Sequence, residues 1–71
     1  MRYSVVLTHG GETKIALIKV IREVTGLGLM EAKDIADGTP AVVVSRVSSE
    51  EARRLERLLV DAGACVELRA E

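Results

Sequence analysis

The sequence predicts an α+β domain of two layers, in which three helices cover one face of a three-stranded antiparallel sheet. The main observation is one of order: segments with strand or helix periodicity follow one another as strand, helix, helix, strand, helix, strand. Length and composition agree, because 71 residues, 48% of them hydrophobic, suffice for one apolar core and leave no room for a second. We therefore expect a single domain over residues 1–71.

The three strands are predicted at residues 2–9, residues 41–47 and about 64–69. The first is rich in β-branched residues and ends at Gly10-Gly11, and the second contains four valines. In the third, apolar and polar residues alternate, which indicates a sheet with one face covered by helices and one wetter face.

The three helices are predicted at residues 14–24, at residues 29–37 and between Ser48 and Gly63. Thr13 is the expected N-cap of the first helix, and Gly26 is its expected stop. Ser48 stands three residues before a glutamate, the spacing of a capping box, and Gly63 supplies a left-handed C-terminal cap. The expected core-facing residues of the third helix are Ala52, Leu55, Leu59 and Ala62.

The first helix has two apolar faces. At about 100° per residue, one arc of the helix holds the expected buried stripe of Leu17, Val20, Ile21 and Val24. The arc outside this stripe holds Ile15 and Ile18 together with the cations Lys14, Lys19 and Arg22. Exposed isoleucines framed by cations suit a surface that docks an acidic partner. The helical wheel leaves an alternative open, in which the second helix packs over both isoleucines and the cations are merely solvated.

Composition excludes several classes of function. A single cysteine, Cys65, and a single histidine, His9, cannot form a disulfide or a zinc ligand set, and Tyr3 is the only aromatic residue available to wall a substrate cavity. We therefore expect no deep active site and no cofactor. The net charge of −1 argues against direct binding of nucleic acid, and no apolar run is long enough to span a bilayer. A cytoplasmic protein is the expectation.

Residues 14–34 resemble a known family. They contain the turn Thr25-Gly26-Leu27-Gly28-Leu29 and the helix start Glu31-Ala32-Lys33-Asp34, and the match continues without gaps from about Tyr3 to Arg69. In this respect the chain is similar to the C-terminal domain of the bacterial large-subunit ribosomal stalk protein, the one numbered seven/twelve. The resemblance implies the same order of strands and helices as the periodicity.

The resemblance also implies a function, and it implies no catalysis. It implies a protein-binding module that recruits translational GTPases, namely elongation factors G and Tu and initiation factor two, to the ribosome. In the family the factor-binding face is formed by the first helix, the glycine turn and the start of the second helix. Carried over to this chain, that face comprises Lys14, Ile15, Ile18, Lys19, Arg22, Gly28, Leu29, Glu31 and Lys33.

The chain departs from the family pattern, and these departures leave alternative functions open. The helical dimerisation domain and flexible hinge of the stalk protein have no counterpart in these residues, so the chain is either an excised piece or a stand-alone relative. Glu23 and Met30 replace a small residue and a frequent lysine, which makes the face less positive. The alternatives are a regulatory adaptor of the same fold, like the adaptor of a proteolytic chaperone, and a decoy that occupies translation factors.

The oligomeric state is also left open. Val60 falls outside the core stripe of the third helix, beside Arg53 and Arg57, where the family more often has a charged residue. An exposed valine at this position is compatible with self-association through the third helix, although single apolar residues on a surface are common.

Overall fold

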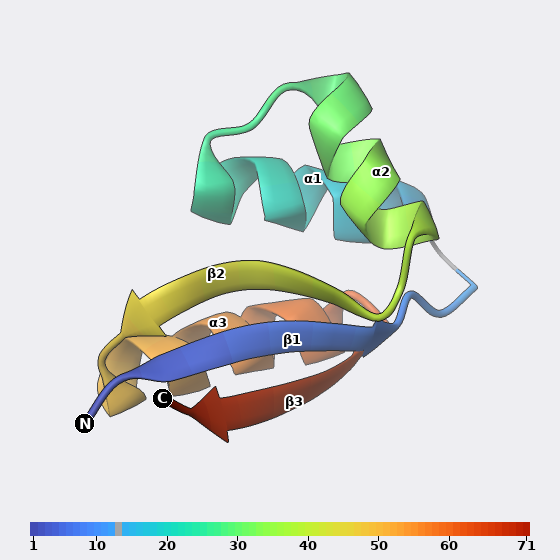
Figure 1. Cartoon of the computed structure of the whole chain (residues 1–71). Helices are drawn as coiled ribbons and strands as arrows, with labels where there is room; N and C mark the ends of the chain where they lie inside the picture. The colour runs from blue at the N-terminus through green and yellow to red at the C-terminus, as the bar shows by residue number, and fades with distance from the viewer. Residues whose placement is uncertain (13) are drawn as a thin grey trace.

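A computed structural model describes residues 1–12 and 14–71 of the chain. It contains three strands and three helices in the predicted order (Figure 1). Their bounds are β1 (Tyr3–His9), α1 (Lys14–Thr25), α2 (Leu29–Asp37), β2 (Ala41–Val47), α3 (Ser49–Asp61) and β3 (Cys65–Ala70). The predicted bounds agree with these to within one residue at nearly every end. The predicted N-cap at Thr13 lies outside the described residues.

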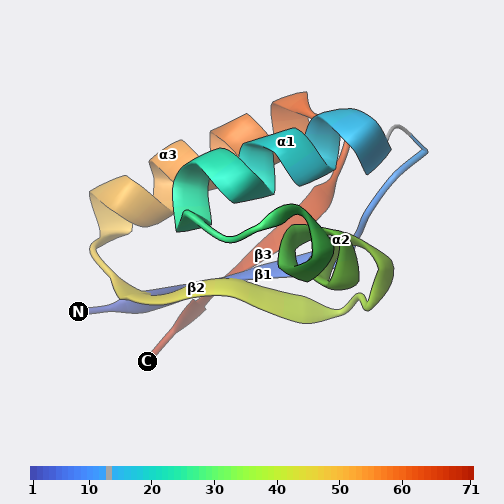
Figure 2. The ribbon, with the colours of Figure 1, turned by 90° about the horizontal axis from the view of Figure 1, so that it is seen from above.

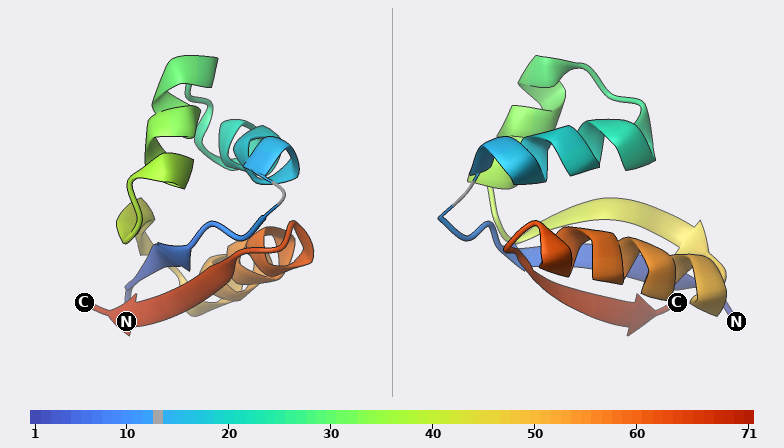
Figure 3. Two further views of the ribbon diagram at one scale, coloured as in Figure 1. Left: turned by 90° about the vertical axis from the view of Figure 1, so that its right-hand side faces the viewer. Right: turned by 180° about the vertical axis from the view of Figure 1, so that it is seen from behind.

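The strands form one antiparallel sheet in the order β2-β1-β3. All three helices lie on the same side of this sheet (Figure 3), as the α+β prediction requires. Viewed from above, α1 and α3 lie side by side over the sheet, and α2 lies over the β2 edge (Figure 2). The two ends of the chain lie at the same end of the sheet (Figure 1), where the Glu71 amide donates a hydrogen bond to the Arg2 carbonyl.

The core lies between the helices and the sheet. It holds Val5 and Leu7 of β1, Leu17 and Ile21 of α1, and the residues Ala32, Ala36, Val43, Ala52, Leu55, Leu59 and Ala64. Val20 and Val24, the other members of the predicted α1 stripe, are partly buried against this core. Ala62 was predicted to face the core but is only half-buried, because α3 ends one residue earlier and Ala62 serves as its C-cap.

The caps of α3 confirm two predictions from the sequence. The Ser48 hydroxyl accepts a hydrogen bond from the Glu51 amide at 3.2 Å, which satisfies one of the free amides of the first turn. The Glu51 carboxylate accepts from Arg54 Nε at 2.7 Å, on the exposed side of the helix. Gly63 has a φ of 95°, the left-handed conformation predicted for the residue that ends this helix.

The two edge strands of the sheet differ. β2 departs twice from regular pairing with β1, on either side of the Val5–Val44 pair, and Arg46 adopts a φ of 59° in this irregular stretch. β3 pairs with β1 without interruption from Tyr3–Ala70 to Leu7–Val66, and its one irregularity follows at His9–Cys65. Pairing along the β2 edge is therefore interrupted by bulges, whereas pairing along the β3 edge is regular over most of its length.

Candidate protein-binding surface

The outer side of α1 is apolar at two positions. Ile15 is 85% exposed, as the helical wheel predicts. The prediction that Ile18 is exposed in the same way is wrong, because Ile18 is half-buried and packs against the core. Ile18 lies only about 60° from the buried stripe on the helical wheel, so neighbouring elements reach part of its side chain. The alternative that the helical wheel left open, in which α2 covers both isoleucines, is wrong at Ile15.

The two isoleucines share a shallow hollow with residues from a second element. Ile15, Ile18, Lys19 and Arg22 of α1 line this hollow together with Leu29, the first residue of α2, and its volume is about 350 Å³. We call these five residues the α1–α2 surface. The volume lies at the lower end of the range for small-molecule pockets, and four of the five side chains are largely exposed. This geometry suits the side chains of a protein partner better than an enclosed ligand.

The glycine turn places Leu29 beside α1. The Thr25 hydroxyl donates to the Ile21 carbonyl at 2.6 Å and accepts from the Leu27 amide at 3.2 Å, so one side chain ties the end of α1 to the turn. Gly26 has a φ of 74° and donates its amide to the Arg22 carbonyl, which ends the helix in the left-handed conformation. The chain then reverses, and α2 begins with Leu29 at 55% exposure.

The α1–α2 surface is positively charged. Within residues 1–12 and 14–71, Lys19 and Arg22 take part in none of the ion pairs. Both cations also line a neighbouring hollow with Glu23, Gly26 and Leu27. Glu23 therefore lies close enough to reduce the positive potential.

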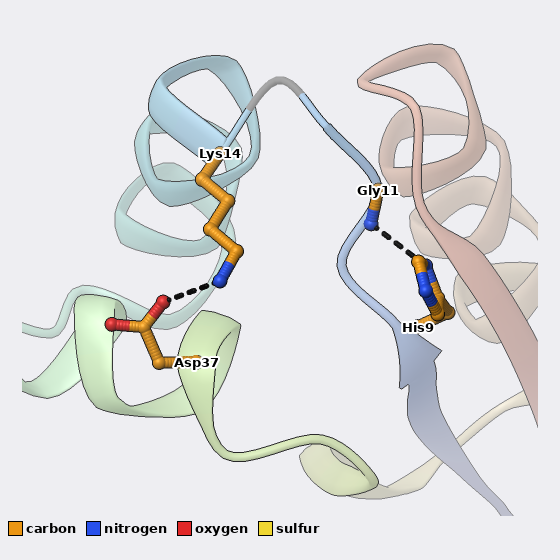
Figure 4. Close-up of polar contacts among 4 residues, drawn as sticks. All are labelled: His9, Gly11, Lys14 and Asp37. Carbon is orange, nitrogen blue, oxygen red and sulfur yellow. Dashed lines mark hydrogen bonds and ion pairs between the residues drawn. The ribbon is translucent and has the colours of Figure 1, made fainter.

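Lys14 lies apart from this surface. Its ammonium donates to the Asp37 carboxylate at 2.9 Å and so joins the start of α1 to the end of α2 (Figure 4). The hydrogen bond from Lys14 holds the pKa of Asp37 below its ordinary value of 3.8; partial burial opposes this shift, and the charges of Lys14 and Lys33 add to it. In the preceding segment, the Gly11 amide donates to His9 Nδ1 at 3.0 Å (Figure 4).

The remaining residues of the predicted face are exposed, but they do not line the hollow. They are Gly28, Glu31 and Lys33, in the turn and the first half of α2. The sequence analysis treated Met30 only as a departure from the family, yet Met30 is 72% exposed directly after Leu29. Its position on the side of α2 away from the buried Ala32 and Ala36 was already visible in the helical period.

The described residues do not indicate a metal site or a membrane-spanning helix. No cluster of three potential metal ligands occurs among the described histidine, cysteine, aspartate and glutamate residues. None of the helices in the described part of the chain has the length and apolar character needed to cross a membrane. Cys65 is an exposed free thiol, and His9 interacts with its own loop.

Comparison with known proteins decides the family. Residues 3–69 match the model of the ribosomal protein L7/L12 C-terminal domain, which covers nearly the whole chain. The chain belongs to this family. The L7/L12 C-terminal domain is part of a ribosomal protein, and the resemblance seen in the turn and the start of α2 is confirmed.

Several curated relatives of the domain share the same name. A large ribosomal subunit protein bL12 of Chlorobium luteolum is 57% identical over 94% of this chain and 54% of its own length. The bL12 proteins of a Sulfurihydrogenibium species and of Nitrosomonas europaea are each 51% identical over 94% of this chain, which corresponds to 52% and 54% of their own lengths. The chain thus spans about half the length of the curated relatives it matches.

Proposed function

We propose that this domain binds translational GTPases, namely elongation factors G and Tu and initiation factor two, through the α1–α2 surface. The family supplies the translational context. The observation that supports the location is the exposure of Ile15 and Leu29 in one hollow with Lys19 and Arg22, two cations that form no ion pair among the described residues. The partner surface that fits is acidic, with an apolar side chain to enter the hollow.

The two kinds of residue have different roles in this proposal. Ile15 and Leu29 supply apolar area, and burying such a side chain fully contributes about 1.5–3 kcal/mol. Lys19 and Arg22 remain at the rim, where an exposed ion pair contributes about 0–1 kcal/mol and mainly steers the encounter. After the costs of association, one small surface of this kind gives dissociation constants in roughly the micromolar range or above, with fast exchange.

An NMR titration of the ¹⁵N-labelled domain with elongation factor G tests the proposal. We expect shift changes in α1, the glycine turn and the start of α2, and we expect Arg22→Glu to weaken binding by about tenfold because attraction becomes repulsion. Arg22 is exposed, so the variant should stay folded.

Arg57→Glu is the matched control, since it makes the same charge change on the exposed side of α3. It should alter affinity much less than Arg22→Glu. Equal effects of the two variants would mean that only net charge matters, and shift changes confined to α3 and the sheet would place the binding surface elsewhere. Both outcomes contradict the proposal.

A factor-dependent GTPase assay separates this function from a regulatory adaptor. The isolated domain, added in excess to ribosomes, should compete for elongation factor G and lower GTP turnover. The Arg22→Glu variant should compete less well than the unchanged domain. If neither protein changes turnover at concentrations that saturate binding, the domain does not act on the factor through this surface.

A further inference from the structure

The β2 strand carries a bulge near its end. Where β1 has only Ser4 between two paired residues, β2 has two residues, Ser45 and Arg46. An extra residue of this kind leaves the regular ladder and can direct its backbone groups elsewhere. Arg46 has a φ of 59°, and its amide donates to Glu71 Oε2 at 2.9 Å. The bulge therefore presents a backbone donor to a carboxylate.

The same carboxylate accepts from a second donor, on β1. Ser4 Oγ donates to Glu71 Oε1 at 2.8 Å, and Ser4 is 8% exposed. Because its neighbour Val5 belongs to the core, Ser4 points to the face of the sheet opposite the helices. The Glu71 amide donates to the Arg2 carbonyl, which fixes this residue directly after β3. One side chain thus joins all three strands at one end of the sheet.

The surroundings favour an ionised acceptor. Arg2, Arg46 and Glu71 line a hollow of about 650 Å³ together with Met1. Neither arginine takes part in an ion pair among the described residues. Their positive charges therefore attract an anion to the two donors, and hydrogen bonds to an ionised oxygen are stronger than those between neutral groups. Because the hollow is far larger than a carboxyl group, a small anion can enter it from solvent.

We propose that the Arg46 amide and the Ser4 hydroxyl form a carboxylate-binding site, which Glu71 fills as an internal ligand. A carboxylate from another molecule binds the same two donors when the Glu71 side chain is removed. The ligand class follows from the geometry, since each donor meets a different oxygen of one planar group with two acceptors. In the intact domain Glu71 holds the three strands together here and keeps external anions out.

This site is independent of the function proposed for the α1–α2 surface. All three helices lie on one side of the sheet (Figure 3), and the Ser4 hydroxyl points to the other side. Loss of the carboxylate-binding site would therefore leave the α1–α2 surface in place, and the two proposals can fail separately.

Urea unfolding tests the internal ligand. Glu71→Ala removes the acceptor of both hydrogen bonds, so we expect it to raise the equilibrium constant for unfolding about tenfold. Glu67→Ala is the matched control, because it removes a nearby glutamate whose side chain forms an exposed ion pair with Arg69. The control should change the constant by less than about threefold. Equal effects of the two variants would overturn the role of Glu71.

Sodium formate tests the site itself, with sodium chloride at the same concentration as the reference. At about 0.5 M, formate should lower the unfolding constant of Glu71→Ala about threefold, which corresponds to a dissociation constant of roughly 0.25 M. The unchanged domain measures any general effect of formate, and it should respond less than about 1.5-fold because Glu71 already occupies the donors. Equal responses of the two proteins would overturn the proposal.

The Arg46 amide resonance of ¹⁵N-labelled protein locates the binding. In Glu71→Ala the amide proton should move upfield, because a hydrogen bond to a charged oxygen is lost, and it should return with a saturable dependence on formate. Adding Ser4→Ala should weaken formate binding at least about threefold, since one of the two donors is removed. An Arg46 amide that responds to neither Glu71→Ala nor formate, or formate binding that Ser4→Ala leaves unchanged, would overturn the proposal.

Discussion

Gly26 and Gly28 occupy the same turn for different physical reasons. Gly26 has a φ of 74°, a conformation that costs an L-residue roughly 1–2 kcal/mol. Gly28 has an ordinary extended backbone, with φ −74° and ψ 172°, and none of the described atoms lies within 4 Å of where its Cβ would be. The fold therefore explains a glycine at position 26 but not at position 28, where the partner contact proposed above would supply a reason.

Gly28→Ser separates stability from binding. Gly28 is the N-cap of α2 and has no side chain to accept a hydrogen bond, so serine should raise the free energy of unfolding by roughly 0.5–1 kcal/mol. The added side chain should weaken binding of elongation factor G several-fold if the partner approaches this backbone closely. Urea unfolding and the NMR titration measure the two effects. Unchanged affinity in a stabilised variant would exclude Gly28 from the contact.

At the scale of elements, the α1–α2 pair is joined at both ends. Thr25 and Gly26 shape the turn between the two helices, and the Lys14–Asp37 ion pair joins their other ends. Packing between the helices buries Ala32 and Ala36 against the core, and these small side chains allow α2 to approach α1. The position of Leu29 beside Ile15 and Ile18 follows from this arrangement.

The Lys14–Asp37 pair predicts a pH dependence. Because the pKa of Asp37 is lower in the folded state than its ordinary value of 3.8, the ionised carboxylate stabilises the fold at pH values above about 4. This contribution is lost as the pH falls below about 4 and through the lowered folded value. Both groups are about half exposed, so the effect is small.

NMR titration of the Asp37 carboxyl carbon measures this shift directly. The midpoint should lie below 3.8 in the unchanged domain and move up toward that value in Lys14→Met, which removes the hydrogen bond and the nearest charge. Lys19→Met, which removes a cation from the hollow, should leave the midpoint unchanged. A midpoint that does not respond to Lys14→Met would show that the pair does not form in solution.

The whole molecule depends on a small aliphatic core. Leu7, Leu17, Ile21, Leu59 and Val5 are its largest fully buried side chains, and no described disulfide or metal cluster supplements them. A domain of this length has a free energy of unfolding of roughly 4–11 kcal/mol. Each large core residue therefore accounts for a substantial part of the total.

Leu59→Ala should show this dependence. The leucine is fully buried between α3 and the sheet, so its truncation should lower the free energy of unfolding by about 2–5 kcal/mol. Leu58→Ala is the matched control. The neighbouring leucine is 37% exposed, so its truncation should lower the free energy of unfolding much less. Urea unfolding followed by circular dichroism measures both. Equal losses would contradict the assignment of the core.

The features predicted correctly from the sequence are those that depend on local interactions. The α3 caps at Ser48 and Gly63 follow from residue spacing, and the buried Leu17 and Ile21 and the exposed Ile15 of α1 follow from the helical period; the structure confirms them. The prediction from the helical period was wrong at Ile18, because the partial burial of this side chain depends on neighbouring elements. Sequence reasoning could not anticipate the Lys14–Asp37 pair, because the two residues are 23 positions apart and meet only once α2 packs on α1.

The sequence by itself determined the order of strands and helices, their ends and the family, since these depend on periodicity, caps and a contiguous motif. Tertiary structure alone decided that Leu29 completes a hollow with Ile15, and that β3 pairs regularly with β1 over most of its length while the pairing of β2 is interrupted twice. The physical reason is distance along the chain: a surface shared by two elements, and the edge that a sheet leaves open, exist only after the elements have packed.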